Sequence, residues 1–146
     1  MEQIGQIFTN KYVYIPFLLW FFIQVSKVIV DLIKTKKFNF KRIMGAGGMP
    51  SSHTAIVTSL AIFIGKEYGF DSGIFALSLI FAFVVMYDAA GIRRAAGKQA
   101  QLLNKIVNTP GLTPVQVQEK LVEVLGHSPK EVLAGAILGI VVGIIL

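Results

Sequence analysis

The chain has 146 residues, of which 54% are hydrophobic and only 15% are charged. Because soluble domains are about a quarter charged, this composition excludes an ordinary water-soluble protein and predicts a single membrane-embedded domain over residues 1–146. The absence of cysteine excludes disulfide, zinc-thiolate and thiol-nucleophile chemistry, and the net charge of +6 indicates cytoplasmic loops beside anionic lipids, with no nucleic-acid partner.

The first apolar segment follows a short polar start and covers residues 12–33. It is long enough to span a bilayer, since about 20 helical residues at 1.5 Å each cross the hydrocarbon core. Its second half contains Gln24, Lys27 and Asp31, which share one helical face. Lys27 and Asp31 could simply pair, but ionisable groups at this depth tend to face a cavity or a site.

A basic loop over residues 34–50 ends in the stretch Gly-Gly-Met-Pro-Ser-Ser-His-Thr, which opens the second span at residues 51–67. Glycines such as Gly48 let the backbone approach a ligand. Ser51 and Ser52 can cap the helix, and the amides of a first helical turn form an anion site. His53 would stand beside a phosphate held there. The alternative is a loop and an N-cap with an incidental histidine.

A tight turn at 68–73 leads into the third span, residues 74–90, which ends near Asp88 and is followed by Arg93 and Arg94. Asp88 either forms an ion pair with Arg94 or Lys27, or belongs to a polar site as an orienting carboxylate. The two arginines either anchor the helix end on the cytoplasmic side or bind phosphate through paired hydrogen bonds.

The last third of the chain contains a polar connection and a fourth span. Val and Leu residues alternate with Gln and Glu over 115–126, which we interpret as an amphipathic helix on the membrane or against the bundle. The fourth span, 129–146, carries Gly135, Gly139 and Gly143 at intervals of four. This spacing brings helices close together and would also allow a homodimer.

Charge gives the expected topology of these four spans. The loops at 34–50 and 91–130 hold eleven of the fourteen Lys and Arg residues. By the positive-inside rule these loops face the cytoplasm and both termini lie outside. The fold class is therefore an all-α membrane bundle of about four transmembrane helices plus an amphipathic connecting helix.

Both histidines fall at the predicted cytoplasmic face, each at a helix entrance. His127 precedes Ser128-Pro-Lys-Glu131, so Glu131 is placed to reach the imidazole and fix its tautomer. The same residues form a capping box, in which Glu131 would bond only to the Ser128 amide. The sequence favours neither interpretation over the other.

Three motifs resemble one known family. Pro50-Ser-Ser-His53 is similar to the Pro-Ser-Gly-His motif of the type 2 phosphatidic acid phosphatases, and His127-Ser-Pro-Lys-Glu131 to their His-x-x-x-Asp motif. Together GGMPSSHT, MYDAAGIRR and LGHSPKEV resemble the small divergent bacterial branch of that superfamily, which also includes vanadium haloperoxidases. The resemblance covers most of the chain from about Gln24.

The resemblance implies a metal-free and cofactor-free reaction. His127 would be the nucleophile that forms a phosphohistidine, Glu131 its carboxylate partner and His53 the general acid. Ser51, Ser52, Gly48 and nearby amides would bind the phosphoryl oxygens.

The chain departs from the family pattern at several positions. It lacks the first motif, a Lys and an Arg-Pro six residues apart. Leu121 stands where the third motif has arginine, and Ser52 replaces a glycine. The positive charge must then come from Lys27, Arg93 and Arg94.

We therefore expect a bacterial cytoplasmic-membrane phosphatase that hydrolyses a lipid phosphate or diphosphate, with its site facing the cytoplasm. The substrate tails would lie between helices, with the head group at the glycine turn. The alternative is a catalytically inactive membrane protein that binds a lipid phosphate or anion in the same cationic pocket. A scaffold whose histidines only cap helices is the third interpretation.

Overall fold

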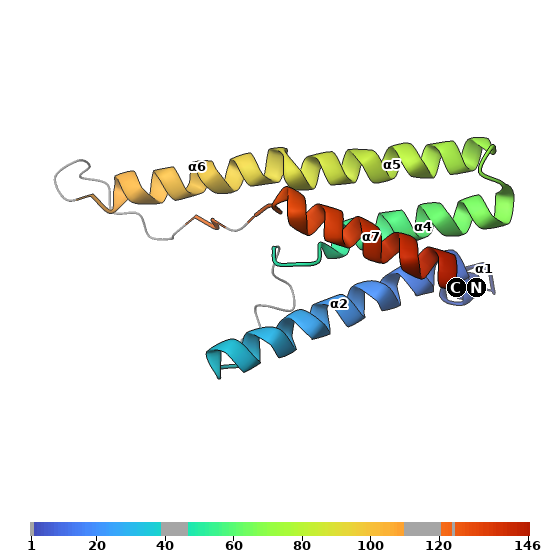
Figure 1. Cartoon of the computed structure of the whole chain (residues 1–146), viewed down its shortest axis with the longest axis horizontal. Coiled ribbons are helices and arrows are strands. Elements are labelled where there is room, and N and C mark those ends of the chain that lie inside the picture. The colour runs from blue at the N-terminus through green and yellow to red at the C-terminus, as the bar shows by residue number, and fades with distance from the viewer. Residues whose placement is uncertain (1, 39–46, 110–120, 124) are drawn as a thin grey trace.

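The computed structural model of the chain describes residues 2–38, 47–109, 121–123 and 125–146, and all of its regular structure there is helical (Figure 1). The prediction of an all-α fold is therefore confirmed. The helices are α1 (Glu2–Thr9), α2 (Lys11–Thr35), α4 (Ser52–Tyr68), α5 (Gly73–Ala90), α6 (Ile92–Val107) and α7 (Pro129–Ile145). The four predicted spans correspond to α2, α4, α5 and α7, with boundaries that differ by one or two residues.

Helix α4 is the centre of the bundle, in contact with α2, α5 and α7. It begins where Ser51 adopts an extended conformation and its hydroxyl accepts a hydrogen bond from the Thr54 amide, a serine N-cap. Small residues recur along the helix and are almost completely buried. They are Ser51, Ser52, Thr54, Ala55, Thr58, Ser59 and Ala61.

The glycine ladder of α7 packs directly on this small-residue face. Gly135, Gly139 and Gly143 are the buried residues of α7. A Cβ atom at Gly139 would overlap the Thr58 hydroxyl and the Ala55 carbonyl oxygen. The predicted role of the ladder in close helix packing is thus confirmed, and its partner is a helix of the same chain. A second copy would need another surface.

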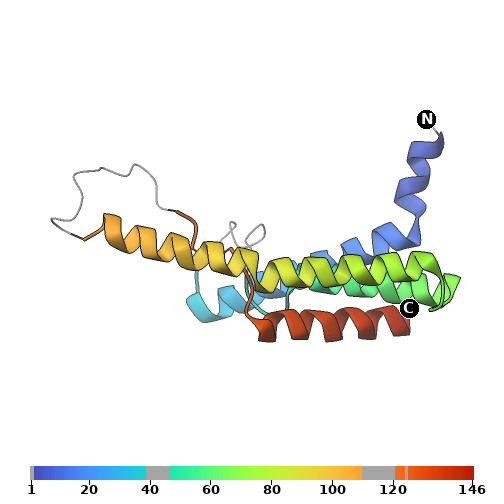
Figure 2. The same cartoon turned by 90° about the horizontal axis from the view of Figure 1, so that it is seen from above.

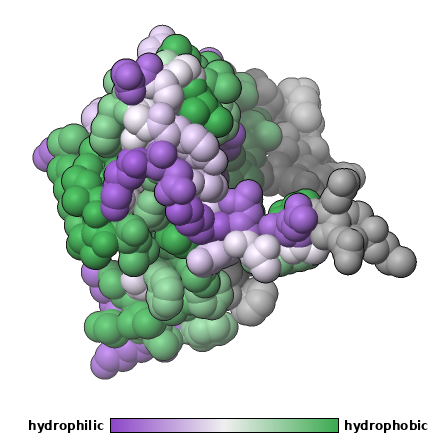
Figure 3. All heavy atoms as spheres, turned by 90° about the vertical axis from the view of Figure 1, so that its right-hand side faces the viewer, coloured by the Kyte–Doolittle hydropathy of each residue, from purple (hydrophilic) through white to green (hydrophobic). Residues whose placement is uncertain are grey.

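Helices α5 and α6 follow one another with only Gly91 between them, and α6 continues beyond the rest of the bundle (Figures 1 and 2). Helix α2 and the 35-residue run Gly73–Val107 are long and apolar enough to cross a membrane. Helices α4 and α7 have 17 residues each. Seen from the end that carries the termini, hydrophobic residues make up much of the surface around a hydrophilic band (Figure 3).

The two termini lie at one end of the bundle, and the starts of α4 and α7 lie toward the other (Figure 1). The connecting helix differs from the prediction. It is α6, at Ile92–Val107, whereas most of the predicted helix at 115–126 lies outside the described residues. Residues 121–123, 125 and 126 are not helical, so that part of the prediction is wrong. They lie beside α6, and the backbone of Leu121 bonds to the side chain of Asn104 on that helix.

Candidate functional site

The two histidines face one another at the end of the bundle where α4 and α7 begin. His53 lies in the first turn of α4, and His127 immediately precedes the N-cap of α7. Their ring centroids are 6.4 Å apart and the ring planes are inclined by 55°. A cavity of about 320 Å³ touches both rings. Its lining residues are His53, Val84, Val85, Asp88, Ala89, Arg93, Leu125 and His127.

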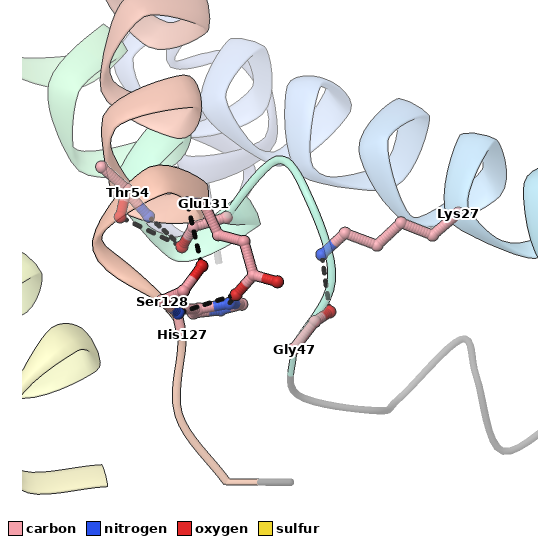
Figure 4. Close-up of polar contacts among 7 residues, drawn as sticks. Lys27, Gly47, Thr54, His127, Ser128 and Glu131 are labelled. Carbon is pink, nitrogen blue, oxygen red and sulfur yellow. Dashed lines mark hydrogen bonds and ion pairs between the residues drawn. The ribbon is translucent and has the colours of Figure 1, made fainter. Parts of the chain in front are cut away.

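His127 is 3% exposed and is held on two sides. Its ring Nδ1 lies 3.3 Å from Oε2 of Glu131, and the Ser128 amide donates to the same carboxylate oxygen at 2.9 Å (Figure 4). The Ser128 hydroxyl accepts from the Glu131 amide, which completes the capping box. Glu131 therefore closes the capping box and also contacts the imidazole, so the interpretation in which it bonds only to the Ser128 amide is wrong. On the other side, the His127 amide donates to the Ala89 carbonyl at 3.0 Å.

The surroundings of His127 favour its neutral form. Burial lowers the pKa of its imidazole most strongly; the hydrogen bond to Glu131 raises it, and the charges of Lys27 and Arg93 lower it further. The net direction is downward from the usual value of about 6.5. A neutral ring whose Nδ1–H donates to Glu131 carries its lone pair on Nε2. Nε2 is then the ring nitrogen with a lone pair that could attack an electrophile.

Asp88 forms an ion pair with Arg93, across the break between α5 and α6. The prediction that Asp88 pairs with Arg94 or Lys27 is therefore wrong, because its partner is Arg93. Arg94 is the next residue around the helix, so it points about 100° away from Arg93. It lines a second cavity, of about 300 Å³, on the side of His127 that carries Glu131. This second cavity is also bordered by Gly97, Lys98, Gln101, Glu123, Gly126 and Ser128.

Lys27 projects from α2 toward the glycine turn. Its side chain is 6% exposed, and its Nζ donates to the Gly47 carbonyl at 3.2 Å (Figure 4). Gly47 and Gly48 have φ angles of 98° and 82°, which favour glycine. Lys27 and Gly48 line a third cavity, of about 240 Å³, together with Ser26, Val30, Asp31, Lys34 and Met49. The glycine turn therefore borders a different cavity from the histidines, although the charge of Lys27 acts on His127.

The two serines of the motif are buried at the start of α4. The Ser51 hydroxyl accepts from the amide and the hydroxyl of Thr54, and its own amide donates to the Glu131 carbonyl at 3.0 Å. Ser51 thus joins the beginnings of α4 and α7 and brings the two histidines together. Ser52 is 2% exposed. Phosphate binding by either serine stays a prediction.

The apolar wall of the histidine cavity was not identified from the sequence. Val84 and Val85 lie about one helical turn before Asp88 and therefore on the same side of the helix. This spacing was the signal by which they could have been assigned to the cavity. Leu125 comes from the connection that was assigned as helix. Within the described part of the chain, no three His, Asp or Glu side chains group as metal ligands.

Comparison with known proteins gives two matches. The model of the divergent PAP2 family matches residues 8–142 of the chain. The uncharacterized membrane protein YuiD of Bacillus subtilis (strain 168) is 41% identical, over 86% of this chain and 86% of its own length. No solved structure matches the chain.

Proposed function

The chain is a membrane protein of the divergent PAP2 family, and on this basis we propose that it hydrolyses a lipid phosphate or diphosphate through a phosphohistidine on His127. The observation that carries the proposal is the pair of imidazoles, with ring centroids 6.4 Å apart, beside one cavity. The cavity combines Arg93, which is ion-paired with Asp88, with the apolar side chains of Val84, Val85 and Leu125. The anionic head and apolar tail of a phosphate ester are complementary to the guanidinium group and to this apolar wall.

The proposed reaction has two steps. In the first, Nε2 of neutral His127 attacks phosphorus and the bond to the leaving oxygen breaks, while His53 donates a proton to that oxygen. In the second, neutral His53 accepts a proton from water as the water oxygen attacks the phosphohistidine. This step releases inorganic phosphate and restores His127. Glu131 stabilises the positive charge that His127 gains when the N–P bond forms.

Positive charge around the phosphoryl group comes from side chains and backbone. Arg93 lines the histidine cavity, and the charge of Lys27 acts on both imidazoles. The first turn of α4 carries the positive end of the helix dipole, although its Thr54 amide is already bonded to the Ser51 hydroxyl. Groups fixed in this way stabilise charge as it develops in the transition state.

We propose that the substrate enters from the membrane, on the cytoplasmic side. Val84 is 60% exposed while it also lines the histidine cavity, so its side of the cavity wall faces outward from α5. A lipid tail would lie against this apolar face with its phosphate between the imidazoles. This places the head group at the histidines and not at the glycine turn that the sequence favoured.

The test is phosphate release by purified protein from a panel of lipid monophosphates and diphosphates, with a metal chelator present. We expect His127→Ala to abolish turnover and His53→Ala to lower it by about 10²- to 10⁴-fold. A substrate labelled on phosphorus should leave an acid-labile, alkali-stable label on the wild-type chain and on none of the His127→Ala chain. The variant Lys105→Gln, at the far end of α6, is the control for a general charge effect.

A non-catalytic lipid-phosphate binder is the second candidate function. The observation that favours it is Leu121, which stands where the family has an arginine and whose backbone bonds to Asn104 instead of contributing to the histidine cavity. Binding of lipid phosphates without turnover or covalent label would identify this function. If neither binding nor turnover occurred, both proposals would be wrong.

A further inference from the structure

The chain returns to the site along α6. We use the name return segment for residues 121–123 and 125–127, which lie beside α6 and run in the opposite direction along it. Contacts join the two at successive points: Asn104 with Leu121 and Glu123, Gly97 with Glu123 and Leu125, and Arg94 with Gly126. The last point is the hydrogen bond from the His127 amide to the Ala89 carbonyl. Each step toward His127 is a step toward α5.

Asn104 makes the contact between α6 and the return segment that is farthest from His127. Its side chain is 6% exposed and its amide group pairs with the backbone of Leu121 in both directions. Nδ2 donates to the Leu121 carbonyl at 2.9 Å, and Oδ1 accepts from the Leu121 amide at 3.1 Å. Nδ2 also donates to Oε1 of Glu123 at 2.9 Å. Such paired bonds fix one residue of the return segment opposite one residue of α6.

Two glycines let the backbones approach between Asn104 and the site. A Cβ atom at Gly97 would overlap the Glu123 carbonyl oxygen. A Cβ atom at Gly126 would overlap the backbone of Arg93 and Arg94. A shift of one residue would bring Leu125 or His127, each with a Cβ atom, to the place of Gly126 against this backbone, and we expect a steric clash.

The contacts along α6 end at the break between α5 and α6. Helix α5 ends at Ala90, so the Ala89 carbonyl lies in its last turn, where helix geometry leaves carbonyls without a partner in the helix. Ala89 is 4% exposed, and its carbonyl is occupied by the His127 amide. The break at Gly91 thus provides the acceptor that holds the backbone of His127.

We infer that α6 is a template that sets the position of His127, with Asn104 as a remote positioning residue. This inference rests on the proposed function for its catalytic consequence, but the positioning itself does not. A slip of one residue would move the return segment by up to about 3.3 Å along α6. His127 would then lose both Glu131 and its position opposite His53. Asn104 acts over about 22 Å, at 1.5 Å for each of the helical residues that separate it from Ala89.

The chain contains two histidines, which makes the test direct. With ring-labelled histidine, NMR would follow the Nδ1–H of His127 that donates to Glu131. We expect Asn104→Ala to shift or broaden this signal and Asn108→Ala to leave it unchanged. Asn108 is the matched control because it lies at the same end of α6 and its side chain bonds to the Asn104 carbonyl, with no hydrogen bond to the described residues of the return segment. An unchanged His127 signal in folded Asn104→Ala would overturn the inference.

A milder variant covers the case in which Asn104→Ala does not fold. Glu123→Ala removes one of the three hydrogen bonds of the Asn104 side chain, and we expect a smaller change of the same signal. Glu123→Gln keeps an acceptor oxygen at that position and should restore the wild-type signal. If Glu123→Ala and Glu123→Gln gave the same His127 signal as wild type, the inference would fail.

The activity measurement separates this inference from the proposed function. If the wild-type protein turns over a lipid phosphate, Asn104→Ala should lower kcat by about 10²-fold, the cost of misplacing a reacting group by about 1 Å. KM should change much less. A raised KM with unchanged kcat would contradict positioning. If the wild type has no activity, the proposed function fails, while the NMR result still decides whether α6 positions His127.

Discussion

At the residue scale, the position of Glu131 couples the start of a helix to the state of an imidazole. One carboxylate oxygen of Glu131 accepts a hydrogen bond from the Ser128 amide and also lies within hydrogen-bond distance of Nδ1 of His127. The capping box would exist in any stable helix beginning of this type. The second contact, between the carboxylate of Glu131 and the His127 ring, is the one that affects the chemistry of the imidazole. The two roles can be separated by substitution, because glutamine also serves in a capping box.

We predict that Glu131→Gln keeps the fold and lowers activity by about 10- to 100-fold, the equivalent of a charged hydrogen bond of about 1.5–3 kcal/mol. The carboxylate raises the pKa of His127 against the effect of burial, so its loss lowers that pKa further. Since only the neutral ring attacks, activity is lost as pH falls through the pKa of His127. The acid limb of kcat/KM should therefore lie below about pH 6.5 and move to still lower pH in Glu131→Gln.

Ser128→Ala is the matched variant at the other side of the capping box. It removes the side-chain cap and should cost about 0.5–2 kcal/mol of stability, measured by unfolding in detergent, with the acid limb unmoved. The same pH profile for Glu131→Gln as for the wild type would contradict a link between Glu131 and the imidazole.

The sequence was sufficient to predict that both histidines and Glu131 lie close together, because each belongs to a local motif. It could not distinguish Arg93 from Arg94. The two are adjacent, and which one faces the histidine cavity depends on the helix break at Gly91 and on how α6 is oriented after it. Lys27 and Gly48 were placed with the phosphate site, yet they border a different cavity, because the glycine turn folds toward α2.

At the scale of elements, the bundle depends on the close contact of α4 and α7. Ser51 is the N-cap of α4, and its amide bonds to the Glu131 carbonyl near the start of α7. The same helix contact therefore also positions the two histidines. The glycine ladder lets the helices approach until side chains of α4 contact the α7 backbone. The geometry of the histidine pair is therefore a consequence of how small the residues are on both helices.

Substitution of Gly139 by alanine tests this contact. The added Cβ would overlap the Ala55 carbonyl, which is backbone and cannot rotate away. Overpacking of this kind costs about 1–3 kcal/mol, partly offset by the better helix propensity of alanine. We expect a lower unfolding midpoint in detergent. Gly73→Ala is the control, because a Cβ there meets nothing within 4 Å; an equal effect of both substitutions would refute the packing argument.

The error at residues 121–123, 125 and 126 also belongs to this scale. The pattern of apolar residues among Gln and Glu favours a helix, but it contains no information about distant partners. A segment outside a helix needs other partners for its backbone, and nothing local in the sequence indicated them. The structure supplies one for Leu121 from Asn104, seventeen positions away. A long-range contact of a single side chain is not visible in a hydropathy pattern.

At the scale of the whole molecule, the arrangement of the four long segments was predictable because each carries its own apolar length and charge at its ends. Both termini lie at one end of the bundle, which agrees with the prediction of four spans (Figure 1). The sidedness in the membrane follows from the loops with eleven of the fourteen Lys and Arg residues and remains a prediction.

A reporter fused after Leu146 should be found outside the cytoplasm, and a reporter inserted in the basic loop at 39–46 should be found inside. An alkaline phosphatase fusion, active only outside, and a fluorescent protein fusion, active only inside, give opposite signals at the two positions. A cytoplasmic C-terminus would reverse the topology and place the histidines at the outer face.

The lengths of the helices determine how deep the histidines lie. Helices α4 and α7 have 17 residues each, about 26 Å, which is less than the roughly 30 Å of the hydrocarbon core. Helix α2 and the α5–α6 run are longer and extend past them on the same side. We propose that the histidines lie in a recess below the surrounding helix ends, near the depth of the lipid glycerol. In that position a lipid phosphate would reach them without extraction of the lipid from its leaflet, and only water would have to enter the recess.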